Sequence, residues 1–181
     1  EKVWRKLECL LRHSEVEYEV YLTQMSGDAA RFASQLRENS REPCVIVAVG
    51  GDGTVNEILN GLSFDGAVTL GYIPIGAGND LARGLKLPRS PQRCLKKILH
   101  SRFYRWLDYG VLSYENGAPI HRRFAVSSGL GLDAAVCQCV REKAVRGQLW
   151  PLSCGRFGYI LLGLQQLLGA KPVRGYVQLD G

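Results

Sequence analysis

The sequence predicts an α/β protein, with a parallel sheet covered by helices on both faces, followed by the start of a β-rich (β-sandwich) second domain. Helical and strand periodicities alternate along the first hundred residues, which is typical of a parallel sheet with crossover helices. The continuous apolar run Cys44–Val49 is typical of a strand buried on both faces. Near residue 103 strand signals replace helical ones. We therefore expect an α/β domain over residues 1–104 and the beginning of a second domain over residues 105–181.

The elements of the first domain follow from the spacing of its apolar residues. Stripes at helical spacing predict helices over Val3–Leu11, Ala29–Leu36 and Val55–Leu62. Alternation or an unbroken apolar run predicts strands over Val16–Leu22, Cys44–Val49 and Leu70–Ile75. A further helix is expected after Ser90-Pro91, because a capping residue there precedes a proline at the first helical position.

The second domain is expected to open with a β-hairpin. Phe103–Leu112 and Arg122–Ser127 have the composition of strands, and Asn116-Gly117 between them is a hairpin-turn dipeptide. We expect the remainder of this domain to lie after Gly181.

The 181-residue chain carries a formal net charge of +6 and has a pI near 9.1. Such a charge favours an anionic partner, either a nucleotide or an acidic membrane surface. The basic residues lie in small clusters that match no nucleic-acid-binding module, so no nucleic-acid partner is expected. Six cysteines without a C-x-x-C pair predict free thiols in a cytoplasmic protein, and no apolar stretch is long enough to span a bilayer.

The strand predicted over Cys44–Val49 runs directly into Gly50-Gly51-Asp52-Gly53-Thr54-Val55-Asn56, and a helix follows. Glycines let backbone N–H groups approach a ligand closely, and a helix start presents unpaired N–H groups and the positive end of its dipole. Such a strand–loop–helix at the carboxyl end of a parallel strand predicts a phosphate-binding site. The alternative is a tight turn that merely requires glycine, but three glycines with an aspartate exceed that need.

Asp52 and Thr54 indicate the chemistry of this site. A carboxylate repels phosphate unless a cation lies between them, so Asp52 implies Mg²⁺, held directly or through water. Thr54 can donate its hydroxyl to a phosphate oxygen, cap the following helix, or do both. The G-x-x-x-x-G-K-[ST] pattern of P-loop proteins is absent from the sequence.

The strand predicted over Leu70–Ile75 also ends in glycines, with Gly76-Ala77-Gly78-Asn79-Asp80 before a short helix. Adjacent parallel strands end at the same edge of a sheet, so the two loops are expected to line one crevice. Asn79 or Asp80 is expected to cap the short helix.

Together the two segments resemble the diacylglycerol kinase catalytic domain family. Gly50-Gly51-Asp52-Gly53-Thr54-x-Asn56-Glu57 and Pro74-x-Gly76-x-Gly78-Asn79-Asp80-x-Ala82-Arg83 are most similar to bacterial lipid kinases, which are related to sphingosine and ceramide kinases. The first segment alone is shared with NAD kinases and is similar to one in phosphofructokinases. Weaker similarity at Tyr18–Thr23, Leu107–Gly110 and Phe124–Ala134 extends the resemblance over nearly the whole chain.

The resemblance implies an ATP-dependent lipid kinase that phosphorylates a lipid hydroxyl, converting diacylglycerol to phosphatidate in phospholipid biosynthesis. Such an enzyme would be cytoplasmic and would meet its substrate transiently at an anionic membrane surface; its oligomeric state stays open, with a homodimer as one option.

The residues implied to contact ATP are Thr23, Gly50, Gly51, Asp52, Gly53, Thr54, Val55, Asn56, Gly76, Ala77, Gly78 and Asn79. The resemblance also implies that Asp52 binds Mg²⁺ through water, that Asp80 lies near the substrate cleft, and that Asp108 lies at the domain junction. Asp52 and Asp80 are the catalytic candidates.

The chain departs from the family pattern in three ways. Ala77 stands where the family usually has threonine, the family's opening strand is absent before Glu1, and the family's late metal ligands and general base would follow Gly181. We therefore expect residues 1–181 alone to be inactive. Two alternatives remain: an NAD kinase-like phosphotransferase, and a nucleotide-binding module without activity.

Overall fold

The computed structural model describes residues 2–39, 43–63, 68–115, 117–145 and 156–169. The chain divides into two compact units, Glu1–Ser127 and Ser128–Gly181.

The first unit is built around two parallel strands, β1 (Cys44–Gly50) and β2 (Val68–Pro74). Cys44 pairs with Val68, and Gly50 pairs with Pro74, so both strands end at the same edge of the sheet. Both strands were predicted from their apolar runs, and the parallel sheet is confirmed.

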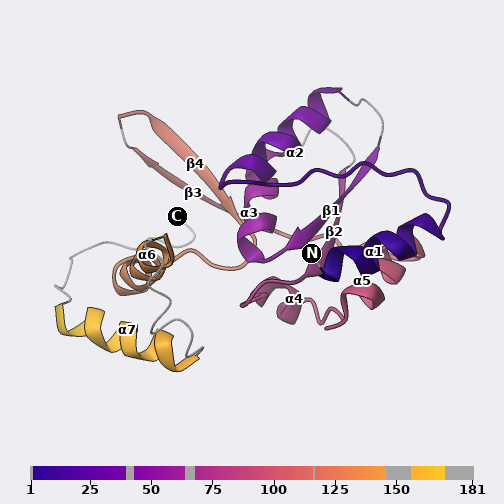
Figure 1. The fold of residues 1–181 in the computed structure, drawn as a ribbon. Helices are drawn as coiled ribbons and strands as arrows, with labels where there is room; N and C mark the ends of the chain where they lie inside the picture. Colours follow the sequence, from indigo (N-terminus) through magenta and orange to yellow (C-terminus); the bar gives the residue numbers. More distant parts are fainter. Residues whose placement is uncertain (1, 40–42, 64–67, 116, 146–155, 170–181) are drawn as a thin grey trace. The chain divides into compact units, whose positions relative to one another are not determined.

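Helices cover both faces of this sheet (Figure 1). On one face lie α2 (Asp28–Asn39) and α3 (Asp52–Gly61), which form a core with Ile46 and Ala48 of β1. A Cβ added at Gly61 would overlap the carbonyl oxygen of Ala30, so glycine at the end of α3 lets the two helix backbones approach closely.

On the other face lie α1 (Lys2–Arg12) and α5 (Pro91–Leu99). Leu7, Ile73, Cys94 and Leu95 form the buried core between these helices and the sheet. The predicted start of α5 is confirmed, because Ser90 is the N-cap and its hydroxyl accepts from the N–H of Arg93 at 3.5 Å.

The prediction of a strand over Val16–Leu22 is wrong. Residues 16–24 form neither helix nor strand, and their side chains are exposed. Alternation of apolar and polar side chains predicts an extended backbone. A β-strand also requires a neighbouring strand with which it forms backbone hydrogen bonds. Among the described residues this segment has no such neighbour.

A β-hairpin of β3 (Gly110–Glu115) and β4 (Pro119–Phe124) completes the first unit. The hairpin was predicted, but β3 begins seven residues later than expected and β4 is shifted toward the N-terminus, because the strands extend only where they pair with each other. Gly117 has the left-handed φ of 74° that a hairpin turn requires, and Asn116 lies outside the described residues.

The described part of the second unit is helical. It contains α6 (Leu132–Val145) and α7 (Arg156–Gly169), which pack against each other and bury Leu162. A β-rich second domain is therefore not seen among these residues, and the expected boundary after residue 104 stays a prediction. In the described ranges, no helix has both the length and the apolar character that crossing a membrane requires.

Candidate functional site

Two loops leave the same edge of the sheet and touch each other. The first loop, Gly50–Asn56, connects β1 to α3, and the second loop, Gly76–Asp80, connects β2 to α4 (Asp80–Gly84). The N–H of Ile75 donates to the carbonyl oxygen of Gly50 at 2.9 Å, so the strand ends remain paired up to the loops. Both loops were expected to line one crevice, and the structure brings them into contact at Gly51 and Gly76.

Glycines allow this contact. A Cβ added at Gly76 would lie 2.5 Å from the Cα of Gly51, closer than such atoms approach, and a Cβ added at Gly51 would lie 3.3 Å from the Cα of Gly76. The residue of these loops with a left-handed backbone is not a glycine but Asn79, whose φ is 55°. The glycines at the contact therefore serve close approach and not an unusual backbone angle.

Neither a close approach of other atoms nor a left-handed backbone explains why residue 53 is glycine. Its φ is not left-handed, and a Cβ added there would meet no atom within 4 Å. Glycine in the first turn of a helix is unfavourable by about 1 kcal/mol relative to alanine. Packing among the described residues does not account for this glycine, whereas a ligand that approaches the backbone closely would.

Asp52 ties the two loops together. Its Oδ2 accepts from the N–H of Asp80 at 2.9 Å, and its Oδ1 accepts from the N–H of Leu81 at 3.1 Å. The carboxylate thus satisfies two of the first N–H groups of α4 and places its charge at the positive end of that helix. The expected cap for α4 was Asn79 or Asp80; Asn79 occupies the N-cap position but its side chain makes no capping bond.

The Asn79 side chain instead closes the second loop on itself. Its Oδ1 accepts from the N–H of Gly76 at 3.1 Å and from the Tyr72 hydroxyl at 3.2 Å, while its Nδ2 donates to the carbonyl of Gly76 at 2.6 Å. Burial, aided by the negative charge of Asp52, raises the pKa of Tyr72 to about 12. The hydroxyl therefore stays protonated and remains a donor.

Several donors in the two loops are unpaired. Among the described residues, no acceptor contacts the backbone N–H groups of Asp52, Gly53, Ala77 and Gly78, and the last three residues are exposed. The Thr54 side chain lies over Gly50, where it would overlap any Cβ, and its hydroxyl has no partner in the described ranges. Gly51 is the N-cap of α3 and the helix has no side-chain capping bond, so of the two roles considered for Thr54 the structure does not show the capping one.

The remaining residues of the first segment hold α3 in place. Val55 is buried in the core, and its N–H donates to the carbonyl of Gly51 at 3.3 Å. The Nδ2 of Asn56 donates to the carbonyl of Arg123 in β4 at 3.0 Å. Glu57 accepts from the Ser26 hydroxyl at 3.0 Å and from the N–H of Ala29 at 3.3 Å, which fastens the start of α2.

Sequence reasoning missed the role of Arg123. Its N–H donates to Oδ1 of Asn60 at 2.8 Å, and its guanidinium donates to the carbonyls of Leu59 and Leu62 at the end of α3. A cation at a helix C-terminus is stabilising because it meets unpaired carbonyls and the negative end of the dipole. No local pattern reveals a contact between residues more than sixty positions apart.

Three further predicted site residues are exposed. Thr23 precedes α2, and the structure shows no bond from Thr23 to either loop in the part it describes. Asp80 forms an ion pair with Arg83, whose guanidinium also bonds the carbonyl of Gly78. Asp108 lies before β3. The structure thus brings Asp52 and Asp80 to one loop contact and leaves Thr23 and Asp108 without a described contact to it.

A direct metal site would require several ligating side chains close together. The described residues contain no group of three or more His, Cys, Asp or Glu side chains that could hold a metal ion. Each carboxylate oxygen of Asp52 accepts one hydrogen bond from a backbone N–H group. Each oxygen therefore keeps at least one lone pair that can accept a further hydrogen bond or bind a cation.

Comparison with known proteins agrees with this arrangement. The family described as "Diacylglycerol kinase catalytic domain" matches residues 1–107. The chain is 31% identical over 166 residues to the diacylglycerol kinase of Bacillus subtilis (strain 168), a match that covers 91% of this chain and 50% of that protein. It is 33% identical over 148 residues to the putative lipid kinase YtlR of the same organism, covering 80% of this chain and 47% of that protein.

A third relative is the probable lipid kinase YegS-like of Chromohalobacter salexigens, 40% identical over 96 residues, with 51% of this chain and 30% of that protein covered. The chain spans about half the length, or less, of these curated relatives. The family match includes both loops and every element from α1 to α5. The chain belongs to the diacylglycerol kinase catalytic domain family.

Proposed function

We propose that this chain carries the ATP-binding part of a lipid kinase, which transfers the γ-phosphoryl group of ATP to a lipid hydroxyl, converting diacylglycerol to phosphatidate. The observation that carries the proposal is the contact of two glycine loops whose exposed N–H groups lack acceptors in the described ranges. Relatives named as diacylglycerol and lipid kinases support the lipid acceptor.

The loops supply the features that bind a triphosphate. The N–H groups of Asp52 and Gly53 lie at the positive end of α3, and those of Ala77 and Gly78 come from the second loop. Phosphate oxygens accept from such groups without a counter-charge from side chains. The Thr54 hydroxyl adds a donor beside them, and the absent Cβ of Gly53 leaves room for the phosphates.

Asp52 fits a cation held through water. Mg²⁺ keeps several of its waters and binds proteins through one or two carboxylates together with substrate phosphates. When bound, Mg²⁺ neutralises charge that develops on the phosphates. The proposed role of Asp52 is to accept hydrogen bonds from the water shell of the ion while it holds the start of α4.

The general base is best sought elsewhere. Asp52 uses both oxygens to accept backbone N–H groups, so taking a proton would weaken the contact between the loops. The Asp80 carboxylate is already engaged in an ion pair with Arg83. Both observations support the inference that a residue other than Asp52 and Asp80 takes the proton.

The proposed acceptor is a lipid, so the enzyme works at a membrane as a peripheral protein. The net charge of +6 supports transient attraction to an anionic leaflet. The alternative acceptor, NAD, remains an outcome of the assay below.

The test uses the intact protein with labelled ATP and Mg²⁺, offered either diacylglycerol in mixed micelles or NAD. We expect labelled phosphatidate and no labelled dinucleotide. Phosphorylation of NAD alone would contradict the lipid assignment. Calorimetric binding of MgATP without turnover of either acceptor would identify a nucleotide-binding module that lacks activity.

A further inference from the structure

The β3–β4 hairpin is fastened to the C-terminal end of α3, the helix whose first turn carries the N–H groups of Asp52 and Gly53. Five hydrogen bonds join Arg123 of β4 to this helix. Arg123 is half-buried there, whereas the neighbouring Arg122 is exposed. One residue of the hairpin thus bonds α3 through its main chain and through its side chain.

The main chain of Arg123 is bonded by two asparagines of α3. In an antiparallel pair, every second residue turns its N–H and C=O away from the partner strand. Asn60 bonds both of these groups of Arg123: its Oδ1 accepts from the N–H at 2.8 Å, and its Nδ2 donates to the carbonyl at 2.9 Å. The Nδ2 of Asn56 donates to the same carbonyl at 3.0 Å. Side-chain amides thus make the bonds that a third strand would make at this edge of β4.

The guanidinium of Arg123 bonds carbonyls in the last turn of α3. It donates to the carbonyl of Leu59 at 3.1 Å and to that of Leu62, and it lies 5.9 Å from the centre of the Tyr109 ring. Carbonyls at a helix C-terminus lack partners within the helix, and a half-buried one is costly to leave unbonded. Removal of the guanidinium would therefore loosen the end of α3 from the hairpin.

The helix α3 connects this contact to the first loop. It has ten residues and spans about 15 Å. Its hydrogen-bonded backbone moves as one body, so a shift at its C-terminal end moves the N–H groups of Asp52 and Gly53 relative to the second loop. Arg123 itself attracts a phosphate at the far end only weakly, because that distance exceeds the Debye length of about 8 Å at physiological ionic strength. Any effect of Arg123 on the first loop is therefore transmitted through the helix.

We propose that Arg123, Asn56 and Asn60 are positioning residues, which set the phosphate-binding end of α3 against the second loop. The inference rests on the proposed ATP site. It gives Asn56 a role through α3 in place of the direct contact with ATP that the family resemblance implies. It also couples the hairpin to the nucleotide: whatever orders the hairpin on α3 raises the affinity for ATP, and bound ATP in turn orders the hairpin.

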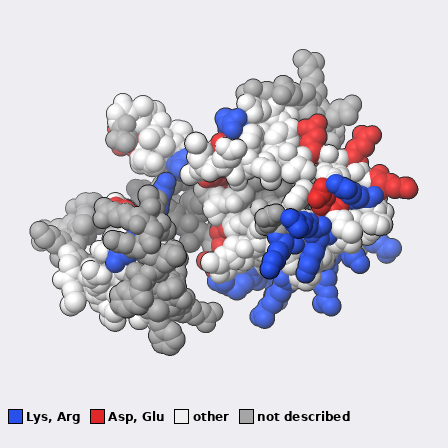
Figure 2. Space-filling model, viewed as in Figure 1, with Lys and Arg blue, Asp and Glu red and all other residues white. Residues whose placement is uncertain are grey.

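A general attraction of ATP to positive charge is a separate effect. The helices α1 and α5 contain seven Lys or Arg residues and one acidic residue. Figure 2 shows Lys and Arg side chains gathered in the lower right of the view, where Figure 1 draws these helices. Arg122→Met removes one charge from β4, and in the described ranges Arg122 has no bond to α3. This variant therefore measures the effect of charge alone.

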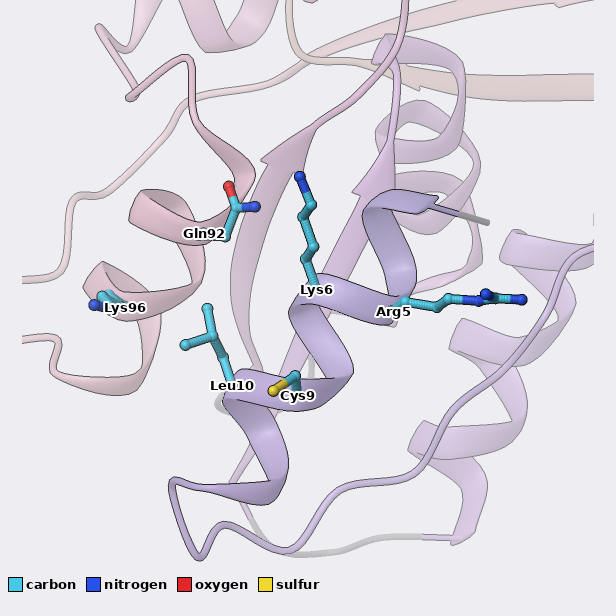
Figure 3. Close-up of a pocket in the computed structure, with 6 residues that line it drawn as sticks. All are labelled: Arg5, Lys6, Cys9, Leu10, Gln92 and Lys96. Carbon is cyan, nitrogen blue, oxygen red and sulfur yellow. The ribbon is translucent and has the colours of Figure 1, made fainter.

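The contact is removed from the hairpin by Arg123→Met and from the helix by Asn60→Ala, both in the intact protein. Arg123→Lys is the conservative variant. Leu10→Ala is the control for stability, because Leu10 packs between α1 and α5 (Figure 3), on the face of the sheet opposite to α3. Circular dichroism confirms that each variant is folded. If Arg123→Met does not fold, Asn60→Ala, which keeps the guanidinium, decides the comparison.

Calorimetry measures the Kd for MgATP, and steady-state kinetics give the KM for diacylglycerol. We expect Arg123→Met and Asn60→Ala to bind MgATP about tenfold more weakly and to keep the KM for diacylglycerol within about twofold. Arg123→Lys should stay within about threefold of the wild type in Kd, because an ammonium still donates to the helix carbonyls. Arg122→Met and Leu10→Ala should bind MgATP as the wild type does, although Leu10→Ala lowers the midpoint of urea unfolding.

Gly53→Ala separates positioning from a loss of stability. Gly53→Ala and Arg123→Met both act on the phosphate-binding end of α3, so their effects on the Kd for MgATP should be less than multiplicative in the double variant. The effects of Gly53→Ala and Leu10→Ala should multiply, because the two sites lie on opposite faces of the sheet.

Three results overturn the positioning role and leave the ATP site standing. They are wild-type affinity in Arg123→Met and Asn60→Ala, an equal loss of affinity in Arg122→Met or Leu10→Ala, and multiplicative effects of Arg123→Met and Gly53→Ala. Failure of the wild type to bind MgATP overturns the proposed function, and the positioning role with it.

Discussion

The two glycine loops leave neighbouring strands at one edge of the sheet, but they are held in different ways. The first loop leads at once into α3, and its Thr54 hydroxyl and Gly53 backbone are left open. The second loop is closed by its own Asn79 side chain and by the carboxylate of Asp52. Both loops have unpaired N–H groups in the described ranges, but those of the first loop belong to the start of a helix, whereas those of the second loop belong to a turn that side chains hold closed.

The largest effect is expected from Gly76→Ala, which breaks the contact between the loops. The new Cβ would lie 2.5 Å from the Cα of Gly51, and backbone atoms on both sides must move to make room. We expect the free energy of unfolding to fall by about 3 kcal/mol, measured by urea denaturation, and MgATP binding to be lost in calorimetry. Unchanged stability would mean that the two loops do not touch.

Asp52→Asn should have the next largest effect. An amide oxygen can accept from only one of the two N–H groups of α4, and the amide NH₂ faces the other, so the start of α4 is left partly unsatisfied. We expect a loss of about 1–2 kcal/mol in the free energy of unfolding and no measurable turnover. Asp80→Asn is the matched control, because its side chain pairs only with the exposed Arg83 in the described ranges, and its stability should stay within 0.5 kcal/mol of wild type, on the order of an exposed ion pair.

Tyr72→Phe tests how the second loop is closed. At neutral pH the loss of the hydrogen bond to Asn79 should cost about 1 kcal/mol. The pKa of Tyr72 is raised from its usual 10 to about 12, so the unfolded chain gives up this proton first and the wild type loses stability as the pH rises above 10. The advantage of wild type over Tyr72→Phe should therefore shrink between pH 10 and 12 in denaturation curves. A constant difference over that range would contradict the buried, protonated phenol.

Gly53→Ala should have the smallest effect on stability and still impair binding. A Cβ at this position meets no protein atom, and alanine is the better helix former, so the free energy of unfolding should rise by up to about 1 kcal/mol. The same Cβ would occupy space proposed for phosphate, and we expect MgATP to bind at least about tenfold more weakly, a change of about 1.4 kcal/mol. Full ATP affinity in a stable Gly53→Ala protein would remove the main argument that this glycine serves a ligand.

Much of the α/β unit could be predicted because its signals are local. Apolar spacing predicted α1, α2 and α3, the pair Ser90-Pro91 predicted the start of α5, and the run Cys44–Val49 predicted a strand with both faces covered. The glycines after β1 and β2 predicted two loops at one edge of the sheet. This was possible because each glycine pattern lies within about ten residues of the sequence.

The rest depended on contacts between distant parts of the chain. Val16–Leu22 has the alternation of a strand, but pairing is decided by a neighbour that the segment itself does not encode. The carboxylate of Asp52 caps a helix 28 residues away, and Asn56 bonds Arg123 at a separation of 67 residues. Local rules assign Asp52 and Asn56 to a ligand and Asn79 to a helix cap, and only the folded chain reveals these other partners.

Asp52 holds the start of α4 and is also proposed to bind the water shell of a cation, so these two interactions depend on each other. The carboxylate shields the amide hydrogens of Asp80 and Leu81 from exchange with solvent. Any cation that draws the carboxylate away must release those two hydrogens, and by reciprocity whatever orders α4 alters the affinity for the cation. Deuterium uptake at the beginning of α4 would then report on the metal without a probe attached to either loop.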